Sequence, residues 1–431
     1  HSLVCDGGPG KISDQAEVTD VLCTHPYPLF TPHCSTDPVN TMRNAFHAAA
    51  ETRLYGDVGG VPAFVEEAGS LGPTFSSETV AAAYLNNMLW NSLAHDCRGL
   101  LWWCANDQTL LKHAPYDWVA MERELGLLRP DREEKPTLRV MKAFGEMLDR
   151  TGLRKLPPFR RDAVMILSQD QDQWGVAYAG FLLAKQAGFD IEFQYSEQAL
   201  KPAKFYILPS IRDTRVMPGR RYRELLRAVQ EGATLLVTSD GGSLEPFNSV
   251  FGIDIATVSR AVAETVISSE ERDFHLRCRS EFQIDLVNRD AEVLAVDSDD
   301  DPIFCCRAFG EGKVLFLAAP IERAASETPR AFLPGGQELY RLYAAAAEKA
   351  GVRRRVFRTN PQLTLTEHEV DPDTLLVIAV NNTPTTFTDE ITSSSEWVFD
   401  SMVWGEPPVV SGFTVQGNSG SILKFRRTKR G

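Results

Sequence analysis

The chain has 431 residues, of which 43% are hydrophobic and 24% charged, a composition ordinary for a globular protein of about two to four domains. Its net charge of -13 argues against a nucleic-acid partner, because binding to phosphates needs a basic face. No apolar stretch is long enough to cross a bilayer, so we expect no membrane partner. The eight cysteines include no Cys-x-x-Cys pair, which indicates reduced thiols rather than a disulfide framework or a zinc site. We therefore expect no metal and no other cofactor.

The first 155 residues alternate between strand and helix patterns. Strands are expected at 2–5, 20–24, 61–69 and 99–104, and helices at about 12–18, 37–54, 76–89 and 137–148. Asp37 before Pro38 is a favourable helix start, because Asp caps the first turn and Pro fits its first position. Four strand–helix units with apolar strands predict half of a (β/α)8 barrel. Half a barrel leaves two unpaired edges, so we expect upstream sequence, a partner chain or a second copy to complete it.

Residues 160–351 form a second block, for which the pattern predicts an α/β domain. Buried strands at 163–167, 205–209 and 234–238 alternate with helices at 174–187 and 220–232, as in a doubly wound, flavodoxin-like sheet. A strand at 313–317 and a helix at 337–350 extend this domain, and 257–307 reads as an antiparallel excursion. From 352 to 431, short strands at 363–365, 374–380, 411–415 and 421–425 predict a small antiparallel β-sandwich.

Polar and aromatic side chains follow three successive strands of the first block. They are His25 and Tyr27, then Glu66 and Glu67, then Trp102 and Trp103. The carboxyl ends of barrel strands meet on one face, where barrel enzymes carry out their chemistry. Hydrolysis of a glycosidic bond needs two carboxyl groups, and a sugar ring stacks on a flat aromatic side chain.

Each of these residues also has a structural interpretation. His25 could be a core histidine, and the two glutamates could simply begin a polar loop. Trp102 and Trp103 must point to opposite sides of their strand, so at least one of them is expected to pack against helices. The combination of all three strand ends is what favours a carbohydrate-active site.

The same residues resemble motifs of family-five glycoside hydrolases and their clan relatives. His25-Pro26-Tyr27 matches the His-x-Tyr that ends barrel strand six, and 64–69 is similar to the Glu-x-Gly of strand seven. The segment 103–107 is similar to the strand-eight Trp of that clan, where Asn-Asp often follows. The resemblance implies that residues 1–155 are the C-terminal half of the (β/α)8 barrel, with strands five to eight. It also implies Glu67 as nucleophile, Tyr27 as its hydrogen-bond donor, His25 in the same network and Trp103 as sugar platform.

Further residues near these motifs are second candidates for contact with a sugar. Gly69 fixes the spacing that favours Glu67 over Glu66 as nucleophile, which leaves Glu66 as a substrate-binding candidate. The other candidates are Trp102, Asp107 and Trp118. Asp107 and Trp118 are also readily explained as parts of loop structure.

The order of domains resembles that of three-domain β-galactosidases, in which a glutamine-amidotransferase-like domain follows the barrel and makes trimer contacts. The resemblance implies a homo-oligomer. An active amidotransferase would need a Cys on the sharp turn after a strand, but the turn after Val237 reads Thr-Ser-Asp-Gly-Gly. Ser239 could replace that Cys only with a His–Glu pair to serve it, and none is placed there.

One departure from the clan concerns the second carboxyl group. The clan's acid/base Glu follows an Asn at the end of strand four, and no Asn-Glu dipeptide occurs in this sequence. We therefore expect the chain to carry the nucleophile of a retaining β-glycosidase that cleaves oligo- or polysaccharides, with its acid/base Glu upstream. The alternative is a non-catalytic carbohydrate-binding or structural subunit derived from such an enzyme.

Overall fold

The computed structural model describes residues 11–69, 71–114, 117–118 and 121–428. The chain divides into two compact units, a first unit of His1–Arg160 with Arg354–Gly431 and a second unit of Arg161–Arg353. The strand expected at 2–5 lies outside the described residues. The division into domains at 1–155, 160–351 and 352–431 stays a prediction.

The N-terminal part of the first unit is built on a parallel sheet of three strands. They are β1 (Leu22–Thr24), β2 (Ala63–Gly69) in the middle, and β3 (Leu100–Trp103). Its helices are α1 (Ile12–Ala16), α2 (Met42–Ala45), α3 (His47–Gly59), α4 (Glu78–Ala94), η1 (Met121–Glu124), α5 (Pro136–Thr151) and η2 (Leu153–Lys155). These strand–helix units confirm the predicted barrel-type α/β arrangement.

Two local features explain where the helices begin. The Ser77 hydroxyl accepts a hydrogen bond from the Val80 N–H at 3.3 Å and so caps α4, as its sequence predicts. The helix start expected at Asp37 is wrong, because α2 begins only at Met42. The Asp37 carboxylate instead accepts a hydrogen bond from Arg43 Nε at 3.0 Å, and both side chains are fully buried. Asp37 is therefore engaged in an ion pair rather than in a helix cap.

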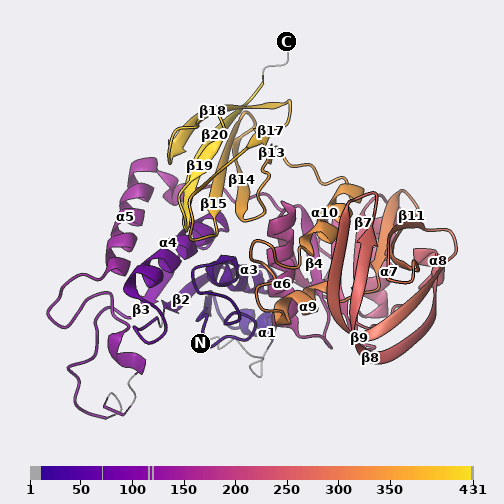
Figure 1. Ribbon diagram of the computed structural model, residues 1–431, viewed down its shortest axis with the longest axis horizontal. Coiled ribbons are helices and arrows are strands. Elements are labelled where there is room, and N and C mark those ends of the chain that lie inside the picture. The colour runs from indigo at the N-terminus through magenta and orange to yellow at the C-terminus, as the bar shows by residue number, and fades with distance from the viewer. Residues whose placement is uncertain (1–10, 70, 115–116, 119–120, 429–431) are drawn as a thin grey trace. The chain divides into compact units, whose positions relative to one another are not determined.

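The C-terminal strands form a four-stranded antiparallel sheet with two small ribbons (Figure 1). The strands are β13 (Val356–Phe357), β14 (Leu363–Asp371), β15 (Thr374–Asn381), β16 (Phe387–Asp389), β17 (Thr392–Ser393), β18 (Trp397–Trp404), β19 (Phe413–Val415) and β20 (Ser419–Arg427). One face of the sheet packs on α4 and α5 through a shared apolar core that includes Trp90, Met147 and Ile378. Sequence reasoning missed β18, although its apolar residues partly alternate.

The second unit contains a nine-stranded sheet in the order β5-β4-β6-β7-β12-β11-β10-β8-β9. Its strands are β4 (Ala163–Leu167), β5 (Ile191–Tyr195), β6 (Phe205–Ile211), β7 (Thr234–Ser239), β8 (Ile253–Ser269), β9 (Phe274–Asn288), β10 (Glu292–Val296), β11 (Pro302–Phe309) and β12 (Gly312–Leu317). Its helices are α6 (Gln173–Ala187), α7 (Gly219–Gln230), α8 (Asn248–Phe251), α9 (Ile321–Glu327) and α10 (Tyr340–Lys349). The first five strands in this order are parallel, which confirms the flavodoxin-like prediction.

The antiparallel part of this sheet differs from expectation in length. Instead of short segments, β8 and β9 form a long hairpin, visible in Figure 1. Strand β5 was not expected, although its alternation of apolar and polar residues is a strand signal.

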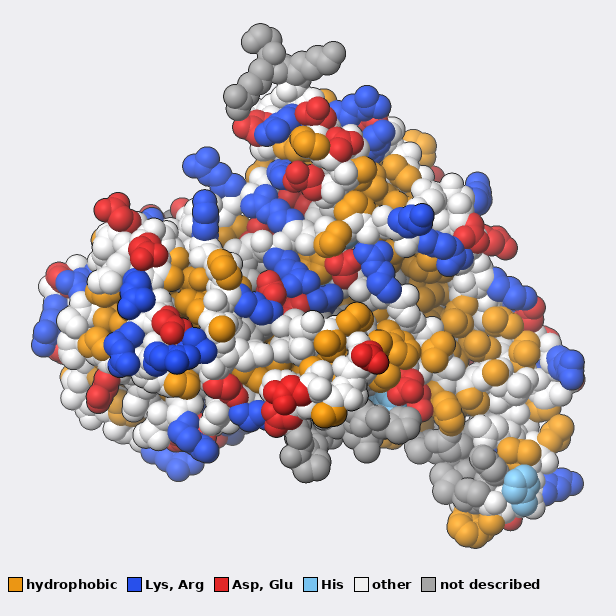
Figure 2. Space-filling view, turned by 180° about the vertical axis from the view of Figure 1, so that it is seen from behind, with side chains coloured by type: hydrophobic (Ala, Val, Ile, Leu, Met, Phe, Trp, Pro, Cys, Tyr) orange, Lys and Arg blue, Asp and Glu red, His pale blue; other side chains and the backbone are white. Residues whose placement is uncertain are grey.

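The surface carries both signs of charge. On the face shown in Figure 2, acidic and basic side chains are interspersed rather than separated into patches. In the described part of the chain, every helix is too short or too polar to span a membrane.

Candidate functional site

A β-bulge at the end of β2 determines where the two glutamates point. Val65 pairs with Leu100 and Ala68 with Trp102, so Glu66 and Glu67 together face a single residue of β3. In a regular strand, successive side chains point to opposite faces of the sheet. A bulge breaks this alternation and often redirects a side chain next to an active site. As a result, both carboxylates approach the same imidazole, that of His25.

Glu67 has one engaged and one available carboxylate oxygen. The Tyr27 hydroxyl donates a hydrogen bond of 2.5 Å to Glu67 Oε2, a length typical of a hydroxyl bound to a carboxylate. Within the described residues, no hydrogen-bond donor contacts Oε1. The side chain is 30% exposed, so a ligand can reach it. This arrangement leaves Oε1 free to act on a substrate.

His25 and Tyr27 are brought together by a tight turn at the end of β1. The backbone N–H of Tyr27 donates to the His25 carbonyl at 2.8 Å, which closes a three-residue turn around Pro26. The two rings lie edge to face with centroids 6.3 Å apart. The His-x-Tyr spacing therefore places both side chains beside the carboxylates of β2.

The His25 ring lies between the two glutamates. Its Nε2 is 3.2 Å from Glu66 Oε2, and its Nδ1 is 3.7 Å from Glu67 Oε2. The first distance allows a hydrogen bond, whereas the second is too long for one. His25, Tyr27, Glu66 and Glu67, which the sequence placed at two strand ends, thus form one cluster.

The two tryptophans of β3 have different environments. Trp102 packs against the apolar core beside α4, and its indole N–H donates to the Leu125 carbonyl at 3.2 Å. A Cβ at Gly69 would lie only 2.8 Å from the Trp102 ring, so this contact needs glycine. The geometry gives Trp102 a packing role in place of the predicted sugar contact. Trp103 is 38% exposed and pairs with Gly69 across the sheet; its peptide bond to Cys104 is cis.

The second-rank candidates lie apart from this cluster. The Asp107 side chain is only 6% exposed and accepts hydrogen bonds from Lys135 Nζ at 2.6 Å and from the Gly126 N–H at 2.8 Å. Its burial and its partners fit a structural ion pair better than the predicted contact with a sugar. Trp118 is 74% exposed, and its ring contacts none of the cluster residues in the described part of the chain.

Exposed phenylalanines extend the aromatic surface beside Tyr27. Phe30 lies 6.5 Å from the Tyr27 ring and Phe75 lies 6.2 Å from Phe30, both edge to face. Each is 47% exposed. Neither phenylalanine is among the site residues predicted from the sequence, and only the position of Phe75 soon after β2 could have indicated it.

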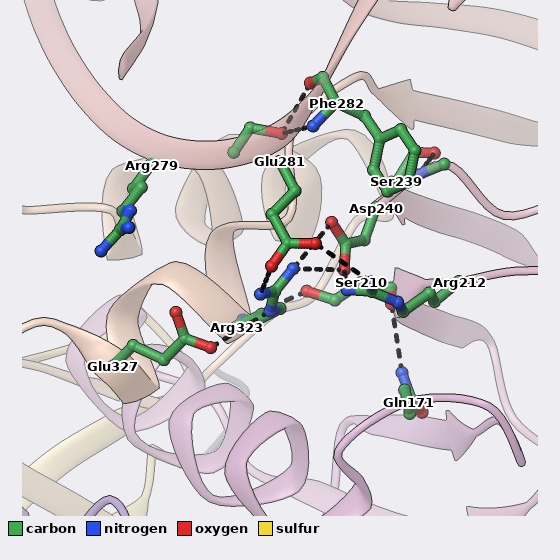
Figure 3. Close-up of polar contacts among 12 residues, drawn as sticks. Gln171, Ser210, Arg212, Ser239, Asp240, Arg279, Glu281, Phe282, Arg323 and Glu327 are labelled. Carbon is green, nitrogen blue, oxygen red and sulfur yellow. Dashed lines mark hydrogen bonds and ion pairs between the residues drawn. The ribbon is translucent and has the colours of Figure 1, made fainter. Parts of the chain in front are cut away.

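A second group of charged side chains surrounds Asp240, which follows the carboxyl end of β7 in the second unit (Figure 3). Asp240, directly after β7, is 1% exposed and accepts hydrogen bonds of 2.9 Å from Arg212 and from Arg323. Glu281 of β9 binds the same two guanidinium groups. These bonds, Arg323 first and Arg212 second, lower the pKa of Glu281 to about 2. The cluster is therefore an internally neutralised ion-pair network.

The turn after β7 gives no sign of a nucleophile. Ser239 is 2% exposed, and its hydroxyl accepts the Gly241 N–H at 3.2 Å. The side chain of Ser239 thus takes part in the hydrogen bonding of its own turn. Across the described residues, no group of three or more His, Cys, Asp or Glu side chains is arranged to hold a metal ion.

The chain matches no protein-family model and no curated protein sequence. Its fold is similar to that of solved glycoside hydrolases. A β-galactosidase from Bacillus circulans sp. alkalophilus has a TM-score of 0.69 over 97% of this chain and 61% of its own, at 15% identity. A GH42 β-galactosidase from G. stearothermophilus has a TM-score of 0.68 over 96% of this chain and 61% of its own, at 12% identity. An exo-β-1,4-mannosidase from Opitutaceae bacterium strain TAV5 has a TM-score of 0.57 over 76% of this chain and 60% of its own, at 19% identity.

These similarities show that the chain shares the fold of these solved structures. They confirm the predicted fold class, with a barrel-type segment, an α/β domain and a C-terminal antiparallel β-region. The chain spans only 61% of the length of the two β-galactosidases.

Proposed function

We propose that the chain carries the nucleophile of a retaining β-glycosidase that acts on oligo- or polysaccharides. The observation that supports this most is the state of Glu67, whose Oε2 is held by Tyr27 at 2.5 Å while Oε1 stays available. A nucleophilic carboxylate needs one oxygen oriented and the other directed at the anomeric carbon. The likeness to solved glycosidases makes the barrel face a suitable place for this chemistry.

The proposed reaction is a double displacement. Glu67 Oε1 forms a bond to the anomeric carbon, while the bond to the leaving oxygen breaks and its electron pair stays on that oxygen. An acid/base glutamate, supplied from outside this chain, protonates the leaving oxygen. The same group then takes a proton from water, which attacks the anomeric carbon and releases Glu67.

The substrate is a carbohydrate held against aromatic side chains. Trp103, Phe30 and Phe75 are exposed and can stack on sugar rings. Because the structural neighbours include β-galactosidases and an exo-β-1,4-mannosidase, β-galactosides and β-mannosides are the first substrates to test.

A mechanism-based label tests the nucleophile without requiring the acid. The 2,4-dinitrophenyl 2-deoxy-2-fluoro-β-glycosides of galactose and mannose release a phenolate that needs no protonation, and the fluorine slows hydrolysis of the adduct. Incubation with the chain should attach the fluorosugar to Glu67, as located by peptide mass spectrometry. Glu281→Gln, which alters the other charged cluster, should leave the labelling unchanged. Labelling of a residue other than Glu67 would contradict the proposal.

A further inference from the structure

The side chains of His25 and Cys23 both interact with the Glu66 carboxylate. Its Oε2 lies 3.2 Å from His25 Nε2. Cys23 of β1 lies next to it, and burial together with the Glu66 carboxylate raises the pKa of the Cys23 thiol. The protonated thiol and the imidazole both face Glu66. Its carboxylate, 29% exposed, is thus held among side chains of the strand that precedes β2 in the sheet.

The contact with Glu66 favours one of the two ring nitrogens of a neutral His25 as the carrier of the proton. A carboxylate only accepts hydrogen bonds, so the 3.2 Å contact is favourable only if Nε2 is protonated. In a neutral imidazole the other nitrogen, Nδ1, is then unprotonated. That nitrogen lies 3.7 Å from Glu67 Oε2, so His25 donates no proton towards Glu67.

This arrangement matters for Glu67 because hydrogen bonds to a carboxylate stabilise its charge and reduce its reactivity. Oε2 already accepts the short bond from Tyr27. If Nδ1 were protonated, a small rotation of the imidazole would give Oε2 a second donor. Keeping the proton on Nε2 leaves Glu67 with Tyr27 as its donor within this cluster.

We infer that Glu66 is a positioning residue, which holds the proton of His25 on Nε2 and thereby keeps His25 from donating to the Glu67 carboxylate. This changes its role from the sugar contact that the sequence suggested. The effect of Glu66 on catalysis rests on the proposed function of Glu67. The tautomer of His25 can be tested whether or not that function is correct.

The tautomer can be read directly from the ring nitrogens. In the full chain labelled with ¹⁵N-histidine, His25 is assigned with a His25→Gln variant and measured at a pH where the ring is neutral. Nε2–H is expected in the wild type and in Glu66→Gln, whose amide oxygen still accepts. Glu66→Ala should move the proton to Nδ1, and Glu66→Ser provides a second truncation if the first variant folds poorly. Glu78→Ala, on α4, serves as control and should change nothing.

Two results would overturn the inference: Nδ1–H in the wild type, or an unchanged Nε2–H in both truncations. A second measurement tests the link to catalysis. The rate of fluoroglycoside labelling should fall about tenfold in Glu66→Ala and be retained in Glu66→Gln, because the added bond involves a charged acceptor. An unchanged rate in Glu66→Ala would contradict the link. If the wild type is labelled at a residue other than Glu67, the proposed function fails while the tautomer result stands.

Discussion

Acidic side chains lie at the carboxyl ends of parallel strands in both units, but their surroundings differ. At the end of β2, Glu66 and Glu67 share one imidazole and are 29% and 30% exposed. At the end of β7, Asp240 is 1% exposed and, like Glu281, is bound by two guanidinium groups. The position at a strand end is therefore not sufficient for a reactive site. An available carboxylate oxygen is found in the first cluster, whereas arginines neutralise the acids of the second.

The largest effect on stability is expected at the second cluster. Asp240→Asn removes the charge that faces Arg212 and Arg323 and should lower the free energy of unfolding of the second unit by about 3 kcal/mol. Urea titration measures the change, and the rate of fluoroglycoside labelling should stay that of the wild type. If Asp240→Asn lost labelling but kept its stability, the cluster around Asp240 would be the reactive site, and the interpretation of both clusters would be wrong.

At the first cluster, Tyr27→Phe is expected to change the rate of labelling rather than the stability. Loss of its 2.5 Å bond to Glu67 leaves the carboxylate free to rotate, so that Oε1 is no longer held towards the anomeric carbon, and labelling should slow by roughly thirtyfold. Tyr222→Phe is a matched control, because the Tyr222 hydroxyl donates to a backbone carbonyl in the second unit. Equal labelling rates in the two variants would show that Tyr27 does not assist Glu67.

A smaller, pH-dependent effect is expected for Glu281→Gln. Arg323 and then Arg212 lower the pKa of Glu281 from 4.5 to about 2. Between these values the native state binds fewer protons than the unfolded state, so the ion pairs contribute stability above pH 4.5 that is lost as the pH falls through about 2. The difference in unfolding free energy between wild type and variant should be less than about 1 kcal/mol. A difference that grows on acidification would contradict this sign.

The smallest effect is expected for Ser239→Ala. The variant loses only the 3.2 Å bond from the Gly241 N–H and should change the unfolding free energy by less than about 1 kcal/mol. Hydrolysis of glutamine, assayed in wild type and variant, should be absent from both. Hydrolysis by the wild type that disappears in Ser239→Ala would show that the second unit has its own nucleophile.

Local sequence predicted the strand ends of the first unit because apolar runs and turn residues mark them. The His-x-Tyr spacing could likewise be recognised as part of a site, because His25, Pro26 and Tyr27 form their turn through local contacts alone. The bulge at Glu66 and Glu67 could not be foreseen, because it depends on the register between β2 and β3. The same register decides that Trp102 faces the core while Trp103 is exposed.

Contacts between distant residues account for the other differences. The ion pair of Asp240 joins Arg212 and Arg323, which precede and follow it by 28 and 83 residues. No local pattern indicates such a partnership. Asp107 illustrates the same limit, since its role depends on Lys135, 28 residues further along the chain.

The nucleophile assignment is tested most directly by replacing Glu67 with glycine and supplying azide. With 2,4-dinitrophenyl β-glycosides, Glu67→Gly should lose turnover, and azide should restore release of dinitrophenolate by attacking the anomeric carbon from the side that the carboxylate occupied. The expected product is an α-glycosyl azide. A variant that keeps its turnover without azide, or that yields the β-glycosyl azide, would contradict the assignment of Glu67 as nucleophile.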